Sequence, residues 1–421
     1  MSRSPERIAW AVLSAALLTC CALTIGVPMA GLAFYNSAMI EAGINVQLQA
    51  GQMGVWRPDQ SDRDPPSVVS LEGYDVSEGS LIALSTDSAG LLTVFDPRTD
   101  PPQALLTAQL HANARLRIAR ARLPRFPAST AQDEYTLYLS EGRAQITIPQ
   151  ANRRFTLQLA GDYATAQTRT PGIYVAEVNG ESLRVHVVAG SATVVNRDND
   201  LAVNLNAGQR TIATRSSLAG ALPPPRSLVR NGQFTSPLQP AWTIETRTGQ
   251  PDATPGVVRV TEQPAGSALL LERLGTNLGW GRTGIAQVLD ARVDGARDVR
   301  LVIEFAILLQ ELPVCASLGS ECPLLVAITW RDDQENSREW IQGFYAVGTP
   351  QMSAGAALLP DTMLANPQRK HVKVPLGQRV RWETDNLLPY LPNVRTIESL
   401  KIYAEGHAVQ AQVFAVALLV E

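Results

Sequence analysis

Hydrophobic residues follow two different patterns along the chain. No residue from Ile8 to Ile40 is charged, and Ile8–Pro28 is almost continuously apolar. Farther on, apolar and polar residues alternate in short runs, as where Ile44, Val46 and Leu48 are separated by polar residues. A continuous apolar stretch of about 20 residues predicts a membrane-spanning helix, whereas a period of two predicts β-strands.

The alternating runs continue through most of the chain. Turn-forming pairs such as Asn179-Gly180 separate them, and no stretch after the apolar segment shows the helical period of about 3.6 residues. We therefore predict an all-β protein behind one N-terminal helix. The runs include residues 183–187, 201–205, 257–261, 301–307, 324–330 and 409–420.

The apolar segment at residues 8–34 is predicted to be an uncleaved signal-anchor helix. Arg3 and Arg7 precede it in a tail of residues 1–7, and the next charge is Glu41. Positive residues flank the cytoplasmic side of membrane helices. We therefore place the tail in the cytoplasm, the helix in the cell (inner) membrane, and the bulk of the chain in the periplasm or outside the cell.

A cleaved signal peptide is the alternative for this segment. Gly31-Leu32-Ala33 would then supply the small residues of the cleavage site. The apolar core of a signal peptide usually has about 7–15 residues, fewer than this segment contains, so its length favours the anchor.

Three consecutive prolines interrupt the alternating pattern within residues 216–227. Proline cannot donate a hydrogen bond to a β-ladder and favours the extended polyproline II conformation, so we predict a semi-rigid linker there. The linker divides the outer part of the chain into two β domains, residues 44–215 and 228–421.

The composition narrows the functional classes. The net charge is −3, from 36 basic and 39 acidic residues, so no basic surface points to a nucleic-acid partner. The chain has four histidines and four cysteines, and no histidine has a second ligand at metal-binding spacing. We therefore expect no transition-metal site.

The sequence contains none of the common catalytic motifs. It has no G-x-S-x-G elbow, no H-E-x-x-H and no P-loop. Residues 279–284 fit G-x-G-x-x-G, but a dinucleotide site needs a helix after this motif, and residues 285–289 are predicted to form a strand. We therefore expect a protein that is not an enzyme.

Two of the cysteines, Cys315 and Cys322, lie close together in the part of the chain that we place outside the membrane. An oxidising compartment and a short intervening loop favour a disulfide between them. A metal site with two thiol ligands is the alternative, but further ligands for it are missing from the flanking sequence.

Tryptophan is the residue type on which a binding site is most easily built in this chain. Flat indole faces contact sugar rings, while polar groups beside them bond to the hydroxyls. The alternative is that each indole fills a β-sandwich core. The acidic residues between two of the tryptophans are candidate ligand contacts, with a weak case for calcium. The candidates are Trp280, Trp330, Trp340, Trp382, Asp332 and Asp333.

Residues 44–215 resemble the extracytoplasmic domain of FecR-like proteins. The resemblance rests on Val46–Gly51 with Trp56, on Gly79–Thr86 and, above all, on the block from Pro171 to Gln209, which contains V-x-V-x-x-G and L-x-A-G-Q. It implies an all-β sandwich or roll that senses or scaffolds and is tethered by one helix. Some FecR-like proteins regulate a sigma factor through a folded cytoplasmic domain; because residues 1–7 are too few to fold, we expect no such role here.

Residues 228–421 resemble a galactose-binding-like jelly roll, the fold of many carbohydrate-binding modules. The resemblance rests on Asn231-Gly232-Gln233-Phe234 followed by Trp242, and on the strand patterns at 283–289 and 413–418. It implies a β-sandwich that binds a glycan. The final strand lacks the acidic pair that such modules often carry there.

These patterns together predict a single-pass, non-enzymatic membrane protein with two extracytoplasmic β domains. The first domain is expected to scaffold or sense, and the jelly roll to bind a glycan or a protein partner at the cell envelope. The alternative is a purely structural subunit of an envelope or membrane complex, in which the jelly roll is a protein-docking surface.

Overall fold

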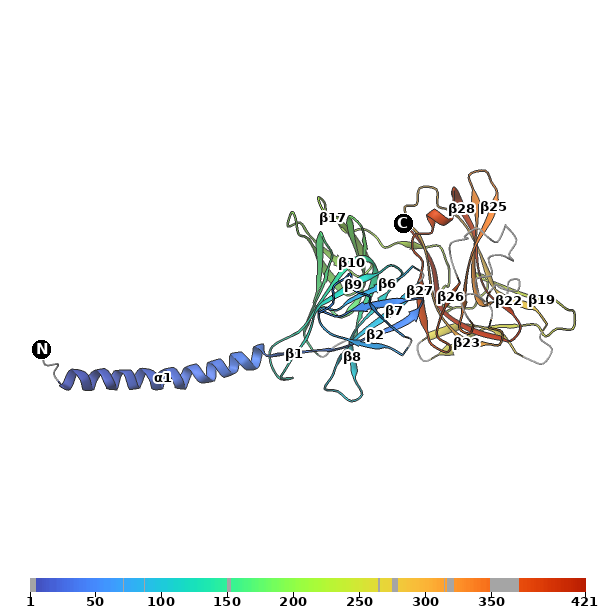
Figure 1. Cartoon of the computed structure of the whole chain (residues 1–421). Coiled ribbons are helices and arrows are strands. Elements are labelled where there is room, and N and C mark those ends of the chain that lie inside the picture. The colour runs from blue at the N-terminus through green and yellow to red at the C-terminus, as the bar shows by residue number, and fades with distance from the viewer. Residues whose placement is uncertain are drawn as a thin grey trace.

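The computed structural model describes residues 5–421 except 71, 87, 150–152, 264–265, 275–278, 314, 316–321 and 349–370. Helix α1, a first β domain and a second β domain follow one another from one end of the molecule to the other (Figure 1). The described chain is β-rich behind one long helix, which confirms the predicted fold class.

Helix α1 (Pro5–Ser37) extends beyond the predicted residues 8–34 at both ends. Its segment Val12–Ser37 is 26 residues long with a mean hydropathy of 2.0, and none of its most apolar stretch is buried. The segment is therefore long and apolar enough to cross a membrane, where a helix satisfies all of its own backbone hydrogen bonds. A signal sequence shares these properties.

The first domain is a closed β barrel in which β10 is shared between two curved sheets. The first half of β10 pairs with β9 and β11, and its second half pairs with β8 and β13. The strands are β1 (Met39–Glu41), β2 (Gly43–Ala50), β3 (Met53–Trp56), β4 (Ser67–Val68), β5 (Tyr74–Val76), β6 (Leu81–Leu84), β7 (Ala89–Asp96), β8 (Gln103–Leu110), β9 (Arg115–Pro124), β10 (Asp133–Ile148), β11 (Phe155–Ala160), β12 (Ala164–Thr168), β13 (Gly172–Asn179), β14 (Ser182–Ala189), β15 (Ser191–Asn196), β16 (Ala202–Asn206) and β17 (Gln209–Thr214).

The alternation read from the sequence matches the burial of these strands. Ile44 and Val46 of β2 are buried while Asn45 and Gln47 are less so, and Leu183 and Val185 of β14 follow the same rule. The inward side chains form one continuous core inside the barrel. The period of two therefore predicted which face of each strand points inward.

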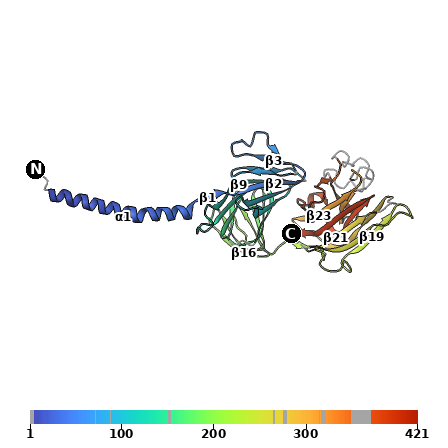
Figure 2. The same cartoon turned by 90° about the horizontal axis from the view of Figure 1, so that it is seen from below.

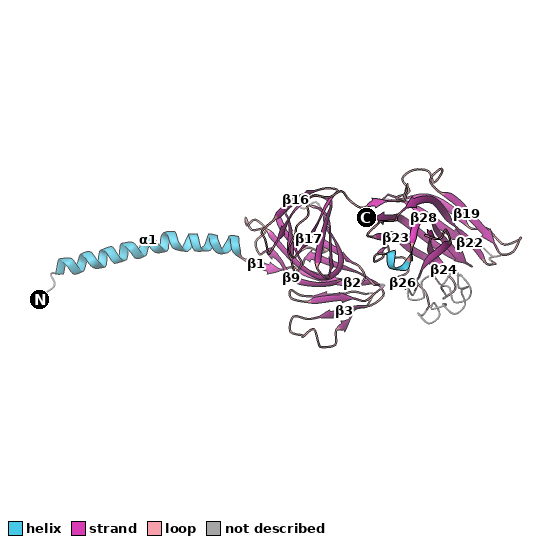
Figure 3. Ribbon diagram, turned by 90° about the horizontal axis from the view of Figure 1, so that it is seen from above, coloured by secondary structure: helices cyan, strands magenta, loops and turns pink. Residues whose placement is uncertain are grey.

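The second domain is a sandwich of two six-stranded sheets (Figure 3). One sheet has the order β20-β21-β29-β23-β27 with β18 beside β29, and the other has the order β19-β22-β28-β24-β25-β26. The elements are β18 (Arg226–Ser227), β19 (Thr243–Thr248), β20 (Val257–Gln263), β21 (Gly266–Arg273), β22 (Gly281–Arg292), β23 (Val299–Gln310), β24 (Cys322–Asp332), β25 (Ser337–Tyr345), β26 (Val372–Lys373), β27 (Val380–Glu383), the 3-10 helix η1 (Leu388–Tyr390), β28 (Val394–Gly406) and β29 (Val409–Val420).

The Pro-rich segment at residues 216–227 is attached at both ends. Leu218 and Leu222 form bridges with β17 of the first domain, and β18 pairs with β29 of the second. Backbone hydrogen bonds therefore tie the predicted semi-rigid linker to both domains. Seen from below, the C-terminal end of the chain lies between the two domains (Figure 2).

Candidate functional site

Three of the four tryptophan candidates lie in the core of the second domain. Trp330 and Trp340 are fully buried, and Trp382 is 2% exposed. Each belongs to the same core cluster, and Trp382 packs edge-on against Phe344 with 4.9 Å between ring centroids. Their faces are covered by other side chains, so these three residues fill the core, as the alternative held, and do not form a platform for a sugar.

Trp280 has a different environment. It precedes β22, and 36% of its surface is exposed. Its ring lies against Gly249, where a Cβ atom would come within 3.0 Å of the indole. Gly249 follows β19, which lies at the end of the molecule farthest from α1 (Figures 1 and 3). One predicted aromatic candidate therefore remains accessible, at the distal end.

Asp332 is the last residue of β24, and Asp333 begins the hairpin turn between β24 and β25. The Asp332 carboxylate accepts hydrogen bonds from the backbone N–H groups of Gln334 and Asn336 and from the Arg338 guanidinium. These bonds fix the turn and occupy the oxygens that a ligand would need. Within the described part of the chain, no group of three or more His, Cys, Asp or Glu side chains could hold a metal ion.

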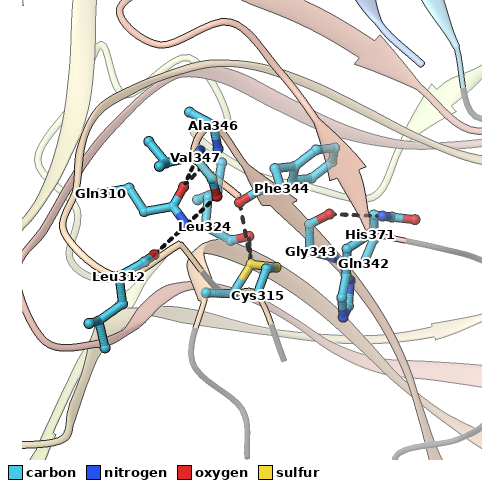
Figure 4. The surroundings of a disulfide bond; sticks show 11 residues. Gln310, Leu312, Cys315, Leu324, Gln342, Gly343, Phe344, Ala346, Val347 and His371 are labelled. Atoms are coloured by element: carbon cyan, nitrogen blue, oxygen red, sulfur yellow. Dashed lines mark hydrogen bonds between the residues drawn. A yellow bond between two sulfur atoms is a disulfide. The ribbon is translucent and has the colours of Figure 1, made fainter. Parts of the chain in front are cut away.

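Cys315 and Cys322 form the predicted disulfide. The pair is buried on the outer face of the sheet that contains β24, beside Gly343 of β25 (Figure 4). A Cβ atom at Gly343 would come within 3.0 Å of both sulfur atoms, which shows how closely the disulfide approaches the strand. The Nδ1 atom of His371 accepts a hydrogen bond from the Gly343 N–H, at 3.0 Å.

A group of charged residues that sequence reasoning did not single out lies between the two β domains. Arg143, Glu177 and Arg184 are cross-strand neighbours on β10, β13 and β14, so their side chains share the outer face of the barrel. Polar residues on the outer face of an antiparallel sheet ordinarily face water. Here they face the second domain.

The second domain supplies mainly acidic side chains. Asp298 precedes β23, Arg300 lies on β23, Glu383 ends β27 and Glu421 follows β29. Four arginines and four carboxylates alternate in one interdomain ion network. Its pairs are Arg210–Glu421, Arg184–Glu421 (3.7 Å), Arg184–Asp298 (3.4 Å), Arg300–Asp298 (2.7 Å), Arg300–Glu177 (2.6 Å), Arg143–Glu177 (3.4 Å) and Arg143–Glu383 (3.1 Å).

The two faces of this network are electrostatically complementary. The barrel contributes three arginines and one glutamate to it, and the jelly roll contributes one arginine and three carboxylates. The side chains of Glu383 and Asp298 are 1% and 8% exposed. Ala50 and Ala89 of the barrel also pack within the hydrophobic cluster of the jelly roll. Charge pairing and apolar contact therefore both join the domains.

The arginines keep the buried carboxylates ionised. Burial alone would raise the pKa of Glu383, but the charge of Arg143, with smaller contributions from His111 and Arg300, leaves that pKa below its ordinary value. The pKa of Glu177 is lowered in the same way, because the charges of Arg300 and Arg143 outweigh its burial. Both glutamates are thus held as ion-pair partners and are not poised to give or take a proton near neutral pH.

His111 lies at the end of this network, in the wall of a cavity of about 320 Å³ between the domains. The side chain is buried, its Nε2 atom is 3.8 Å from Glu383 Oε2, and neither ring nitrogen has a hydrogen-bond partner among the described residues. Burial lowers the pKa of His111 to about 4; Glu383 opposes this effect and Arg143 adds to it. The ring is therefore neutral at pH 7.

A larger hollow, of about 490 Å³, lies on the barrel at β12, β15 and β16. Its walls include Gln167, Thr193 and Asn204, which are cross-strand neighbours. The Thr193 hydroxyl donates a hydrogen bond to Asn204 Oδ1, at 2.8 Å, so part of its bonding capacity is already used. The interdomain network is the more specific feature, because its charged groups are buried and paired across two domains.

Comparison with known proteins gives only distant similarities. No family model matches the chain, and no curated protein matches it. A solved structure described as an anti-sigma factor from Parabacteroides distasonis is 13% identical with a TM-score of 0.26, covering 34% of this chain and 59% of that one. This chain thus spans about three fifths of the length of that protein.

Two carbohydrate-binding modules are similarly distant. The family 11 module of a cellulosomal cellulase from Clostridium thermocellum is 12% identical with a TM-score of 0.27, covering 47% of this chain and 95% of the module. A xylan-binding domain from Paenibacillus barcinonensis is 11% identical with a TM-score of 0.26, covering 47% of this chain and 95% of that one. At such TM-scores these similarities carry no argument about function.

Proposed function

We propose that the chain is a single-pass, non-enzymatic membrane scaffold that holds a jelly-roll domain at a fixed position outside the cell membrane. The observation that supports this best is the continuous connection from the helix to the far domain. Helix α1 is separated from β1 by Ala38 alone, and the interdomain ion network joins the two β domains. A connection of this kind transmits the position of the anchor to the distal end.

The proposed anchor is tested by measuring whether the full-length chain remains in the membrane and which part of it is protected from protease. We expect the chain to stay in the membrane after alkaline extraction, because α1 crosses the lipid and does not merely contact its surface. Protease added from the outside should digest both β domains and leave α1 protected. A soluble mature chain that begins after Ala33 would instead identify α1 as a signal peptide and contradict the scaffold.

For the jelly roll we propose a binding role at the end farthest from the membrane. Trp280 is partly exposed there, and Ile244 of the neighbouring β19 is 46% exposed. An exposed indole supports contact with the face of a sugar ring, and Thr246 and Arg247 of β19 present exposed polar side chains. A glycan of the cell envelope is therefore the proposed ligand, and a protein partner is the alternative.

Replacing Trp280 with alanine should weaken glycan binding by the full-length chain roughly tenfold, since burying an indole face contributes about 1–2 kcal/mol. A glycan array probed with the detergent-solubilised chain measures this. Val288→Ala is the matched control, because Val288 lies on β22, the strand that follows Trp280, and is 72% exposed. If the full-length wild-type chain binds no glycan but captures an envelope protein, the jelly roll is a protein-docking surface.

A further inference from the structure

The barrel begins directly at the end of the membrane-spanning helix. Helix α1 ends at Ser37, and β1 then pairs with the end of β9, with Met39 opposite Pro124. The Ala38 N–H donates a hydrogen bond to the Phe34 carbonyl, at 2.9 Å, which extends the helical bonding pattern up to the first strand. The end of the helix and the edge of the barrel are therefore one continuous structure.

A loop of the barrel is bonded to the last turn of the helix. This membrane-side loop, Arg125–Thr130, leads from β9 toward β10. The backbone N–H of Arg125 donates a hydrogen bond to the Ala38 carbonyl at 2.8 Å. The backbone N–H of Thr130 donates one to Asn36 Oδ1 at 3.1 Å. The loop thus lies at the same level along the helix axis as residues 36–38.

Aromatic rings join the loop and the helix at this level. The ring of Phe126 stacks on Tyr35 with 4.7 Å between centroids and 16° between planes, and its edge meets Phe34 at 6.2 Å. Phe34 is still 57% exposed, so the three rings form a cluster that is open on one side. Tryptophan and tyrosine are enriched where membrane helices cross the headgroup level.

The length of the helix places this cluster at a membrane surface. Trp10, at the other end of the apolar segment, is 69% exposed. About 25 residues separate Trp10 from Tyr35, which at about 1.5 Å per residue gives roughly 37 Å. A bilayer has a hydrocarbon core of about 30 Å and a total thickness of about 40–45 Å with its headgroups. When Trp10 lies at one interface, Tyr35 and Phe126 lie at the other.

Arginines surround the base of the loop. Arg125 is exposed, and Arg98 donates a hydrogen bond from Nη1 to the Pro124 carbonyl at 2.8 Å. Arg153 pairs with Asp96 at 2.9 Å and with Asp133 at 3.0 Å. Arg98 also pairs with Asp96, so these two carboxylates are matched by Arg98 and Arg153, while the exposed Arg125 extends the positive charge beside the rings. An exposed arginine at this level attracts anionic lipid headgroups.

From these contacts we propose that the Arg125–Thr130 loop is a second membrane contact, made with the headgroups of anionic lipids. Phe126 lies beside Tyr35 at the boundary between headgroups and acyl chains, and Arg125 contacts lipid phosphates. This inference rests on the proposed function, because it requires that α1 crosses the membrane. It adds that the barrel rests on the membrane surface and is thereby prevented from tilting about the end of the helix.

Three single cysteines in the full-length chain test this proposal. Each is introduced into a chain that carries Cys20→Ala and Cys21→Ala, and each is labelled with a fluorophore. Quenchers attached to lipids at known depths then report how deep each label lies in the bilayer. Ala22→Cys reports the middle of α1, Ala128→Cys the tip of the loop, and Thr246→Cys the distal end on β19. The chain is reconstituted in vesicles of phosphatidylcholine that contain phosphatidylglycerol.

We expect the label at position 128 to be quenched several-fold more by a shallow quencher than the label at 246, and the label at 22 to respond most to a deep quencher. Adding Arg125→Glu and Phe126→Ala should reduce quenching at 128 and leave position 22 unchanged, because the backbone bonds of the loop to residues 36 and 38 remain. If position 22 is deep and position 128 behaves like 246, the loop contact is wrong and the anchor stands. If position 22 is not in the bilayer, the proposed function fails as well.

Discussion

Replacing Glu383 with alanine should lower the free energy of unfolding by about 3–5 kcal/mol. The Glu383 side chain is 1% exposed and pairs with Arg143, which is itself only 17% exposed. Its removal leaves the guanidinium of Arg143 without this partner in a region with little water. Arg143 then shares its remaining carboxylate partner, Glu177, with Arg300, so one positive charge of the buried network is left uncompensated, and such a charge is costly.

Urea unfolding of the full-length chain in detergent, followed by tryptophan fluorescence, measures this loss. The matched control is Glu335→Ala, because Glu335 pairs with Arg331 and Arg395 but is 58% exposed. We expect a loss below about 1 kcal/mol for that exposed carboxylate. Equal losses for the two variants would show that the domains are not held together by the interdomain ion network.

Lowering the pH from 7 to 4 should destabilise the chain by several kcal/mol. Burial lowers the pKa values of His111 and His371 from 6.5 to about 4. The unfolded chain therefore binds protons more tightly at these residues, and stability falls as the pH drops from about 6.5 toward 4. Each histidine accounts for about 3 kcal/mol over this range.

The buried glutamates act in the same direction at lower pH. The pKa values of Glu177 and Glu383 lie below the ordinary value of 4.5, so their stabilising contribution is present above that pH. It is lost as the pH falls through the lowered values. Acid unfolding should therefore begin with the histidines and be completed by the carboxylates.

Unfolding free energies measured by urea titration at a series of pH values check this prediction. His371→Gln should flatten the pH dependence between 6.5 and 4, because a glutamine can accept the Gly343 N–H bond without titrating. The prediction fails if the wild-type chain has the same free energy of unfolding at pH 7 and at pH 4.5.

Much of the fold follows from the phase of the strands. Leu324, Val326, Ile328 and Trp330 are spaced two apart along β24 and belong to the main core of the second domain, so the period of two also predicts that Trp330 shares the inward face of its neighbours. The prediction that Trp330 is a binding platform rested on its residue type alone. Its position within the strand determines its environment. Trp280 lies just outside a strand and is the candidate that stayed accessible.

The interdomain network could not be read from the sequence in the same way. Arg184 lies on the polar phase of β14, and that phase predicts only that it points away from the barrel core. Its partner Asp298 lies 114 residues farther along the chain, so local patterns carry no information about the pair. The hairpin that turns at Asn179-Gly180 places Glu177 opposite Arg184, and this charged cross-strand pair was an available signal.

The single residue between α1 and β1 has a consequence for several copies of the chain in one membrane. Because a single residue separates the proposed membrane anchor from the barrel, every anchored copy would present its distal end at the same height. The ends of neighbouring copies form a plane parallel to the bilayer. A partner with repeating binding sites, such as a polymer lying along that plane, would engage many ends at once, and its overall affinity would exceed that of one contact by a large factor.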